Sequence, residues 1–208
     1  FSLAACAKGG AQAEADPLAA LTAPSSWGAS NPDWVQPYEP FRVIGNIYFV
    51  GPRGLGAWLI AGDEGHILLD AGLPENAPLI ARNIEALGFN ISDIKILLNS
   101  HAHFDHSGGL AAMKLLTGAR LLAMEGDRSA LEGGFYLGSE DDEDMSAPPV
   151  VVDGIVGDGE TVRLGAVALT AHLTPGHTRG CTTWTLTAEE AGEGYEGLFF
   201  CSATGAAN

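Results

Sequence analysis

The feature that most constrains this sequence is a cluster of metal-binding side chains at residues 101–106, which read His-Ala-His-Phe-Asp-His. Neutral imidazole and ionised carboxylate groups bind zinc at about 2.0–2.2 Å. The apolar run before the cluster, residues 94–98, predicts a buried strand. The run after it, residues 110–116, predicts a helix that ends at Gly118. The cluster is therefore expected on a loop at the carboxyl end of a strand, where α/β sheets gather their ligand-binding groups.

The spacing within the cluster favours two metal positions. His101 and His103 are two residues apart, so in extended backbone they project to the same side and can reach one ion. Asp105 and His106 are adjacent where the chain turns into the helix, and they would point to a second position. Two ions about 3.5–4 Å apart are the more economical interpretation. The alternatives are four surface polar residues or a single structural zinc.

A third ligand for the first ion comes from a second strand end. The predicted strand 167–173 runs into a Thr-Pro-Gly turn followed by His177. Three histidines and a water leave zinc with an exchangeable position, as catalytic sites need. His66 and His172 lie in or beside strands without ligand neighbours, and we expect both to be packed or hydrogen-bonded.

The rest of the chain predicts one domain rich in strands, with a folded part that begins near Trp34. The 208 residues suit one domain of ordinary size or slightly more, and the 46% apolar fraction allows a sizeable core. Further strands are predicted at 41–44, 47–50, 57–61, 66–69, 120–123, 150–152, 161–164, 181–187 and 197–202. Further helices are predicted at 77–87 and 125–131.

The charge of the chain limits the partners it could have. The net charge of −16 argues against nucleic acid or an anionic membrane surface. No run of eighteen apolar residues is present to span a membrane. The acidic run at residues 140–144 predicts a solvated surface loop; a calcium site is the alternative, but the alternating ligand spacing of a calcium loop is absent.

The N-terminal residues indicate export. Residues 3–6, Leu-Ala-Ala-Cys, resemble a bacterial lipobox, in which Cys6 would be lipidated and would anchor the chain to the outer membrane. The alternative is an ordinary secretory cleavage site. Residues 7–30, rich in Ala, Gly, Pro and Ser, predict a flexible tether. We therefore expect residues 1–30 to be an export-signal remnant and tether, residues 31–208 to form the folded domain, and the location to be periplasmic or otherwise exported.

Two cysteines remain besides Cys6. Cys181 and Cys201 lie on consecutive predicted strands, and in an exported protein such a pair favours a disulfide. Two buried, reduced cysteines are the alternative.

Several segments together resemble the metallo-β-lactamase superfamily, and in detail its subclass B3 β-lactamases. The superfamily resemblance rests on residues 101–106, on Thr-Pro-Gly-His-Thr-Arg-Gly-Cys at 174–181 and on Leu-Leu-Asp-Ala-Gly at 68–72. The subclass resemblance rests on residues 40–48, on Leu-Asn-Ser at 98–100 and on Cys-Thr-Thr-Trp at 181–184. The resemblance implies an α+β fold, an αβ/βα sandwich of two mixed β-sheets flanked by helices.

The resemblance also implies the roles of the metal ligands. His101, His103 and His177 would hold the first zinc, and Asp105 and His106 the second, together with a further histidine. The sequence contains no histidine after His177. We therefore expect a fragment whose C-terminal part is missing. The complete enzyme would bind two Zn²⁺ ions, whereas this chain would bind at most one firmly.

Other residues receive roles by the same resemblance. Ser202 and Thr204 would bind the substrate carboxylate. A disulfide between Cys181 and Cys201 occurs in relatives. Asp70 would support the site from the superfamily's Asp-x-Gly turn without binding metal.

The activity implied is hydrolysis of the β-lactam amide bond by a zinc-bound hydroxide, with Asp105 orienting that hydroxide, and hence resistance to β-lactam antibiotics. Fold and metal loop are shared by many hydrolases, so they do not identify the substrate by themselves. The alternatives are a glyoxalase II-like thioesterase, a lactonase, or an inactive zinc-binding fragment.

Overall fold

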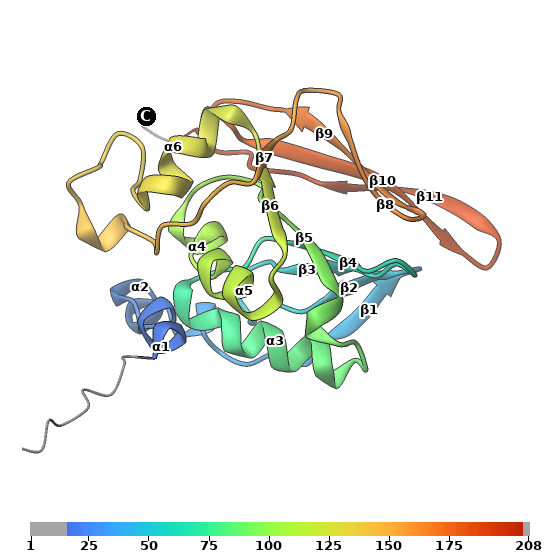
Figure 1. Ribbon diagram of the computed structural model, residues 1–208, viewed down its shortest axis with the longest axis horizontal. Helices are drawn as coiled ribbons and strands as arrows, with labels where there is room; N and C mark the ends of the chain where they lie inside the picture. The colour runs from blue at the N-terminus through green and yellow to red at the C-terminus, as the bar shows by residue number, and fades with distance from the viewer. Residues whose placement is uncertain (1–15, 206–208) are drawn as a thin grey trace, which may run out of the picture.

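The computed structural model describes residues 16–205, and Cys6 lies outside them. Two β-sheets are stacked face to face, and helices cover the outer face of the first sheet (Figure 1). This is the α+β sandwich that the sequence predicts.

The first sheet has seven strands in sequence order, and it is mixed. Neighbours from β1 to β4 are antiparallel, whereas those from β4 to β7 are parallel. The strands are β1 Phe41–Ile44, β2 Ile47–Phe49, β3 Trp58–Ile60, β4 His66–Leu69, β5 Ile94–Leu98, β6 Arg120–Ala123 and β7 Gly154–Ile155. The helices between the parallel strands are α3 Ala77–Ala86, α4 Phe104–Ser107, α5 Leu110–Thr117 and α6 Glu125–Gly133.

The second sheet has four strands in the order β11-β10-β9-β8, and all its neighbours are antiparallel. The strands are β8 Thr161–Leu164, β9 Val167–Leu173, β10 Thr182–Glu190 and β11 Glu193–Phe199. Within the described residues this differs from the expectation of a second mixed sheet. The connections β8–β9 and β10–β11 are two-residue turns with Gly165 and Gly192 at positive φ, and turns this short join only antiparallel neighbours.

Alternation along the central strands divides the core into two layers. Leu59, Leu68 and Leu97 are fully buried and pack with residues of α3 and α5. Ile60 and Ile67, which point the other way, pack against the second sheet. Because side chains alternate along a strand, strands covered on both faces read as continuous apolar runs, as residues 67–69 of β4 and 96–98 of β5 do. The carboxyl end of β5 is therefore held firmly from both sides.

The structure differs from the expected flexible tether over residues 17–30. Helices α1, Pro17–Leu21, and α2, Ser26–Ser30, are present, and the side chains of their N-cap residues Asp16 and Ser25 accept hydrogen bonds from backbone N–H groups of the first turn. Trp27 in α2 stacks on Phe104, with ring centroids 4.9 Å apart. Burial of these aromatic rings is the physical reason that the segment packs.

The strand expected at residues 150–152 forms further along the chain, whereas the surface loop expected at residues 140–144 is confirmed. Residues 150–152 were expected as a strand, but pairing with β6 begins only where the backbone N–H of Asp153 donates to the carbonyl of Leu121, so β7 follows at residues 154–155. The acidic run 140–144 is exposed throughout, as expected of a solvated loop. Among residues 16–205, no helix has both the length and the apolar character needed to cross a membrane.

Candidate metal centre

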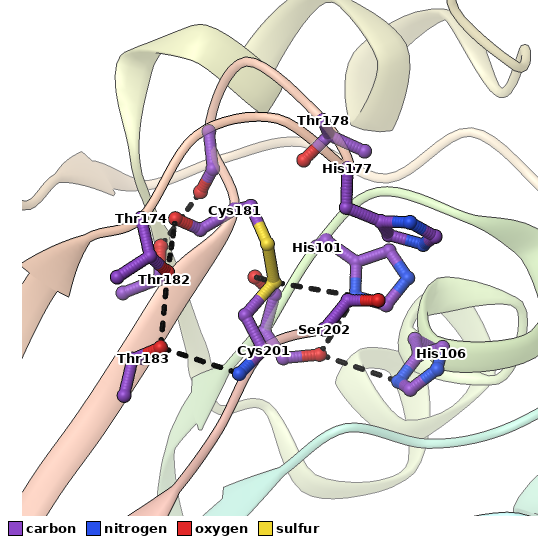
Figure 2. Close-up of a disulfide and its surroundings, with 12 residues drawn as sticks. His101, His106, Thr174, His177, Thr178, Cys181, Thr182, Thr183, Cys201 and Ser202 are labelled. Atoms are coloured by element: carbon purple, nitrogen blue, oxygen red, sulfur yellow. Dashed lines mark hydrogen bonds between the residues drawn. A yellow bond between two sulfur atoms is a disulfide. The ribbon is translucent and has the colours of Figure 1, made fainter. Parts of the chain in front are cut away.

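Two loops from different sheets meet at one edge of the sandwich. One loop follows β5 and carries residues 99–103, and the other follows β9 and carries residues 174–181. The backbone N–H of Thr182 donates to the carbonyl of Ser100 at 2.7 Å, which ties the start of β10 to the first loop. Figure 2 shows His101, His106 and His177 converging beside this junction.

The three histidines predicted for the first ion come together. One ligand atom from each of His101, His103 and His177 lies within 4.8 Å of the others. Nδ1 of His103 and Nε2 of His177 are 3.0 Å apart. Tetrahedral zinc with bonds of about 2.0–2.1 Å places its nitrogen ligands roughly 3.3 Å from one another. The donor set therefore fits a zinc ion.

Burial keeps two of these imidazoles in the form that metals bind. His101 and His103 are 2% and 4% exposed. Burial, and then the neighbouring His106, His103 and His177, lower the pKa of His101 far below its ordinary value. Burial, and then His177 and His106, lower the pKa of His103 to about 3. Zinc requires neutral imidazole, so both groups are ready to bind near neutral pH.

The second group contains Asp105 and His106, as predicted, together with His101. One ligand atom from each lies within 4.8 Å of the others. Nε2 of His106 is 3.7 Å from a carboxylate oxygen of Asp105. Burial alone would lower the pKa of His106, but its hydrogen bond to Asp70 and the charges of Asp70 and Asp105 outweigh burial and raise it.

Asp70 holds Ser100 and His106 in place through its carboxylate. Its carboxylate accepts hydrogen bonds from the backbone N–H and the hydroxyl of Ser100, both at 2.7 Å, and lies 3.0 Å from Nδ1 of His106. Asp70 has φ of +60°, a left-handed conformation that Asp tolerates better than most residues. The bond from Nδ1–H of His106 leaves the lone pair of Nε2 free to face Asp105 and a metal.

The segment after β11 borders the first group. Cys201 is joined to Cys181 by a disulfide, and its Sγ lies 3.3 Å from the carbonyl oxygen of Ser100 (Figure 2). The hydroxyls of Ser202 and Thr204 are 3.1 Å apart. The hydroxyl of Thr204 is 3.2 Å from Nδ1 of His177. The two residues expected to bind substrate therefore lie beside the candidate metal ligands.

The two histidines predicted to be structural form hydrogen bonds and belong to neither group of candidate ligands. Nε2 of His172 is 2.8 Å from the hydroxyl of Thr185, and Nδ1 of His66 accepts from the backbone N–H of Gly62.

Two residues near the site were not anticipated from the sequence. The ring of Tyr136 stacks on His103 with centroids 4.0 Å apart. Burial, and then the charge of Asp105, raise the pKa of Tyr136. Asp127 is a buried carboxylate that accepts hydrogen bonds from both loops that carry the candidate ligands. Neither residue has a sequence signal, because each reaches the site through tertiary packing.

The match of this chain to a protein family covers most of the folded part. The metallo-beta-lactamase superfamily model matches residues 50–186. The chain belongs to the metallo-β-lactamase superfamily. This fold implies a divalent metal, typically zinc, and the two side-chain groups described above are where the chain could hold it.

Solved structures confirm the resemblance to subclass B3. BJP-1, a subclass B3 metallo-β-lactamase of Bradyrhizobium japonicum, is 49% identical, with a TM-score of 0.81 over 83% of this chain and 65% of that chain. FEZ-1 from Legionella gormanii is 43% identical, with a TM-score of 0.77 over 80% of this chain and 64% of that chain.

A curated relative carries a different name. A hydroxyacylglutathione hydrolase of Rhodospirillum rubrum is 31% identical over 134 residues, which is 64% of this chain and 40% of the relative. The chain thus spans less than two thirds of the length of each of these three proteins.

Proposed function

We propose that this protein is a zinc-dependent hydrolase that opens the amide bond of β-lactams. The observation that carries the proposal is the 49% identity to BJP-1 across 83% of the chain. The match to a hydroxyacylglutathione hydrolase is weaker and shorter, at 31% identity over 64% of the chain. The side chains around the two ligand groups are compatible with this chemistry.

The proposed ligands are those that the structure brings together. His101, His103 and His177 would hold the first ion, and Asp105 and His106 would supply two of the ligands of the second. When bound, zinc supplies a coordinated water whose pKa is lowered to about 7, and it polarises the carbonyl oxygen under attack.

The chain's own residues have three tasks in this reaction. Water must lose a proton as it adds to the carbonyl carbon, and the ring nitrogen must gain one as the C–N bond breaks. Asp105 would orient the attacking water, and one of its carboxylate oxygens would hold that proton between the two events. Asp70 holds His106 in one tautomer through Nδ1. The hydroxyls of Ser202 and Thr204 would donate to the carboxylate that β-lactam substrates carry.

The test compares two substrates on the same protein. We expect the zinc-loaded chain to open the ring of a chromogenic cephalosporin with a kcat/KM at least about tenfold above that for a glutathione thioester. A chelator should abolish this activity and added zinc should restore it. Faster hydrolysis of the thioester would instead favour the hydroxyacylglutathione hydrolase function and refute the proposal.

A matched pair of histidine variants checks the site. His177→Ala removes a proposed ligand, so zinc binding and ring opening should fall together. His172→Ala removes a histidine that bonds to Thr185 outside both ligand groups, so it should retain both properties. Equal losses in the two variants would contradict the assignment.

We also propose that the protein is exported, with Cys6 as its lipid attachment site. The disulfide between Cys181 and Cys201 supports an oxidising compartment. Expression with the natural leader should place the wild-type chain in the membrane fraction and Cys6→Ser in the periplasmic fraction. The same fractionation for both proteins would refute lipidation.

A further inference from the structure

Asp127 is a buried carboxylate that belongs to neither group of metal-binding side chains. It lies in the first turn of α6 and is 3% exposed. Burial of a carboxylate is costly unless hydrogen bonds replace its water. The residues that donate those hydrogen bonds therefore identify the segments that this carboxylate holds together.

All three of its hydrogen-bond donors lie in the loops that carry the histidines. One oxygen accepts from the backbone N–H of Ala102 and from the hydroxyl of Thr178, both at 2.9 Å. The other oxygen accepts from the backbone N–H of Gly180 at 2.8 Å. Ala102 lies between the two histidines of the first loop, and Thr178 directly follows His177. The carboxylate thus joins the two loops within one residue of every imidazole in the first group.

Two glycines allow the start of α6 to lie close to the loop at 177–180. A Cβ added to Gly126 would lie 2.6 Å from the carbonyl carbon and oxygen of Arg179. A Cβ added to Gly180 would lie 2.6 Å from the carboxyl carbon of Asp127. The two glycines therefore let the helix pack directly on the backbone of the second loop, with no side chain between them.

We propose that Asp127 is a positioning residue for the three-histidine metal site, which sets the distance between the loop at 101–103 and the loop at 177–180. It touches neither the metal nor the substrate, and acts through the backbone of Ala102 and the side chain of Thr178. The inference rests on the proposed metal site, but it does not depend on which substrate is hydrolysed.

The main test is metal affinity in Asp127→Asn. The amide group keeps the shape but only one acceptor oxygen. If that oxygen still meets Ala102 and Thr178, its bonds to the two loops lose the negative charge that strengthens them, and the NH₂ group faces the N–H of Gly180, so the second loop loses an acceptor. We expect zinc affinity, measured by competition with a chromophoric chelator, to fall at least about tenfold, as is typical when outer partners of metal ligands are lost. The absorption bands of bound Co²⁺ should shift, because they report ligand geometry. The matched control is Glu125→Gln, which neutralises an exposed carboxylate on the same helix and should leave both readouts unchanged.

A second pair of variants applies if Asp127→Asn does not fold. Thr178→Ser keeps the hydroxyl that donates to Asp127, whereas Thr178→Val removes it. We expect wild-type zinc affinity in the serine variant and weaker binding in the valine variant. Equal affinities in these two would overturn the proposal.

The outcomes separate this inference from the proposed function. Asp127→Asn with a lower melting temperature, but unchanged zinc affinity and Co²⁺ spectrum, would make Asp127 merely structural and overturn the inference. A wild-type chain that binds no zinc would overturn both. A wild-type chain that binds zinc but leaves β-lactams intact would refute the function alone.

Discussion

Replacing Asp70 by Asn should destabilise the metal-free chain and change the protonation of His106. In the wild type, one carboxylate meets two donors on Ser100 and Nδ1 of His106. Asparagine offers one acceptor and places an NH₂ group where the other oxygen was. It can still accept from the backbone of Ser100, and the serine hydroxyl can rotate to accept in turn. Nδ1 of His106 then faces a donor, so the proton of the neutral ring should move to Nε2.

The expected magnitude follows from the bonds that are lost. A hydrogen bond to a charged group contributes about 1.5–3 kcal/mol. Two such bonds, to Nδ1 of His106 and to the Ser100 hydroxyl, are replaced by weaker bonds between neutral groups, in which the amide NH₂ donates. We therefore expect a decrease of about 2–4 kcal/mol in the free energy of unfolding, a large share of the about 5–15 kcal/mol typical of a domain. The pKa of His106 should also fall, because the hydrogen bond and charge that raise it are removed.

Two measurements on the metal-free chain check this prediction. Urea denaturation gives the free energy of unfolding, and long-range ¹H–¹⁵N NMR of the imidazoles gives the tautomer and the pKa of His106. Asp63→Asn, the same change at an exposed position, should alter stability by no more than about 0.5 kcal/mol. A loss below about 1 kcal/mol in Asp70→Asn, with the proton still on Nδ1 of His106, would refute the reasoning.

Three further predictions concern stability. His101 and His103 have lowered pKa values in the folded chain but titrate near 6.5 when unfolded, so the unfolded state takes up more protons below about pH 6.5. The unfolding free energy of the metal-free chain should therefore fall as pH drops from about 7 to about 5, by up to about 1.4 kcal/mol per pH unit for each histidine, and pH-independent urea midpoints would contradict this. Reduction of the Cys181–Cys201 disulfide, which closes a loop of separation 20, should cost about 3 kcal/mol in the same assay, whereas an unchanged midpoint after reduction would exclude this contribution. Trp184→Phe leaves the carbonyl just after β5 without its indole donor and should cost about 1–3 kcal/mol, and a neutral effect by thermal unfolding would show that this bond is dispensable.

The strand, the helix and the first ligand loop of the site could be predicted because each is specified by residues that are close together in the sequence. The apolar run 94–98 and the helix after it specify where the first loop lies, and the ligands of residues 101–106 are contiguous in sequence. The Thr-Pro-Gly turn indicated His177 because it too follows a strand.

What the sequence did not reveal depends on contacts between distant segments. Asp127 lies 25 residues from Ala102 and 51 from Thr178, so no spacing rule connects them. The helices at 17–30 could not be predicted because the composition of this segment is typical of linkers. In the fold, Leu18 and Leu21 of α1 pack against the main core cluster, and Trp27 of α2 stacks on Phe104. The position of β7 depends on its pairing with β6, which begins where the backbone N–H of Asp153 donates to the carbonyl of Leu121, and the apolar run alone could not locate that start.

The origin of the three histidines has a consequence for how the sandwich stays assembled. Two belong to the first sheet and the third, 74 residues further along the chain from His103, belongs to the second. An ion bound by all three would cross-link the two sheets, in addition to any role in catalysis. The stability of the folded sandwich would then depend on the concentration of free zinc. An ion that binds only the native form raises the free energy of unfolding in proportion to the logarithm of its free concentration.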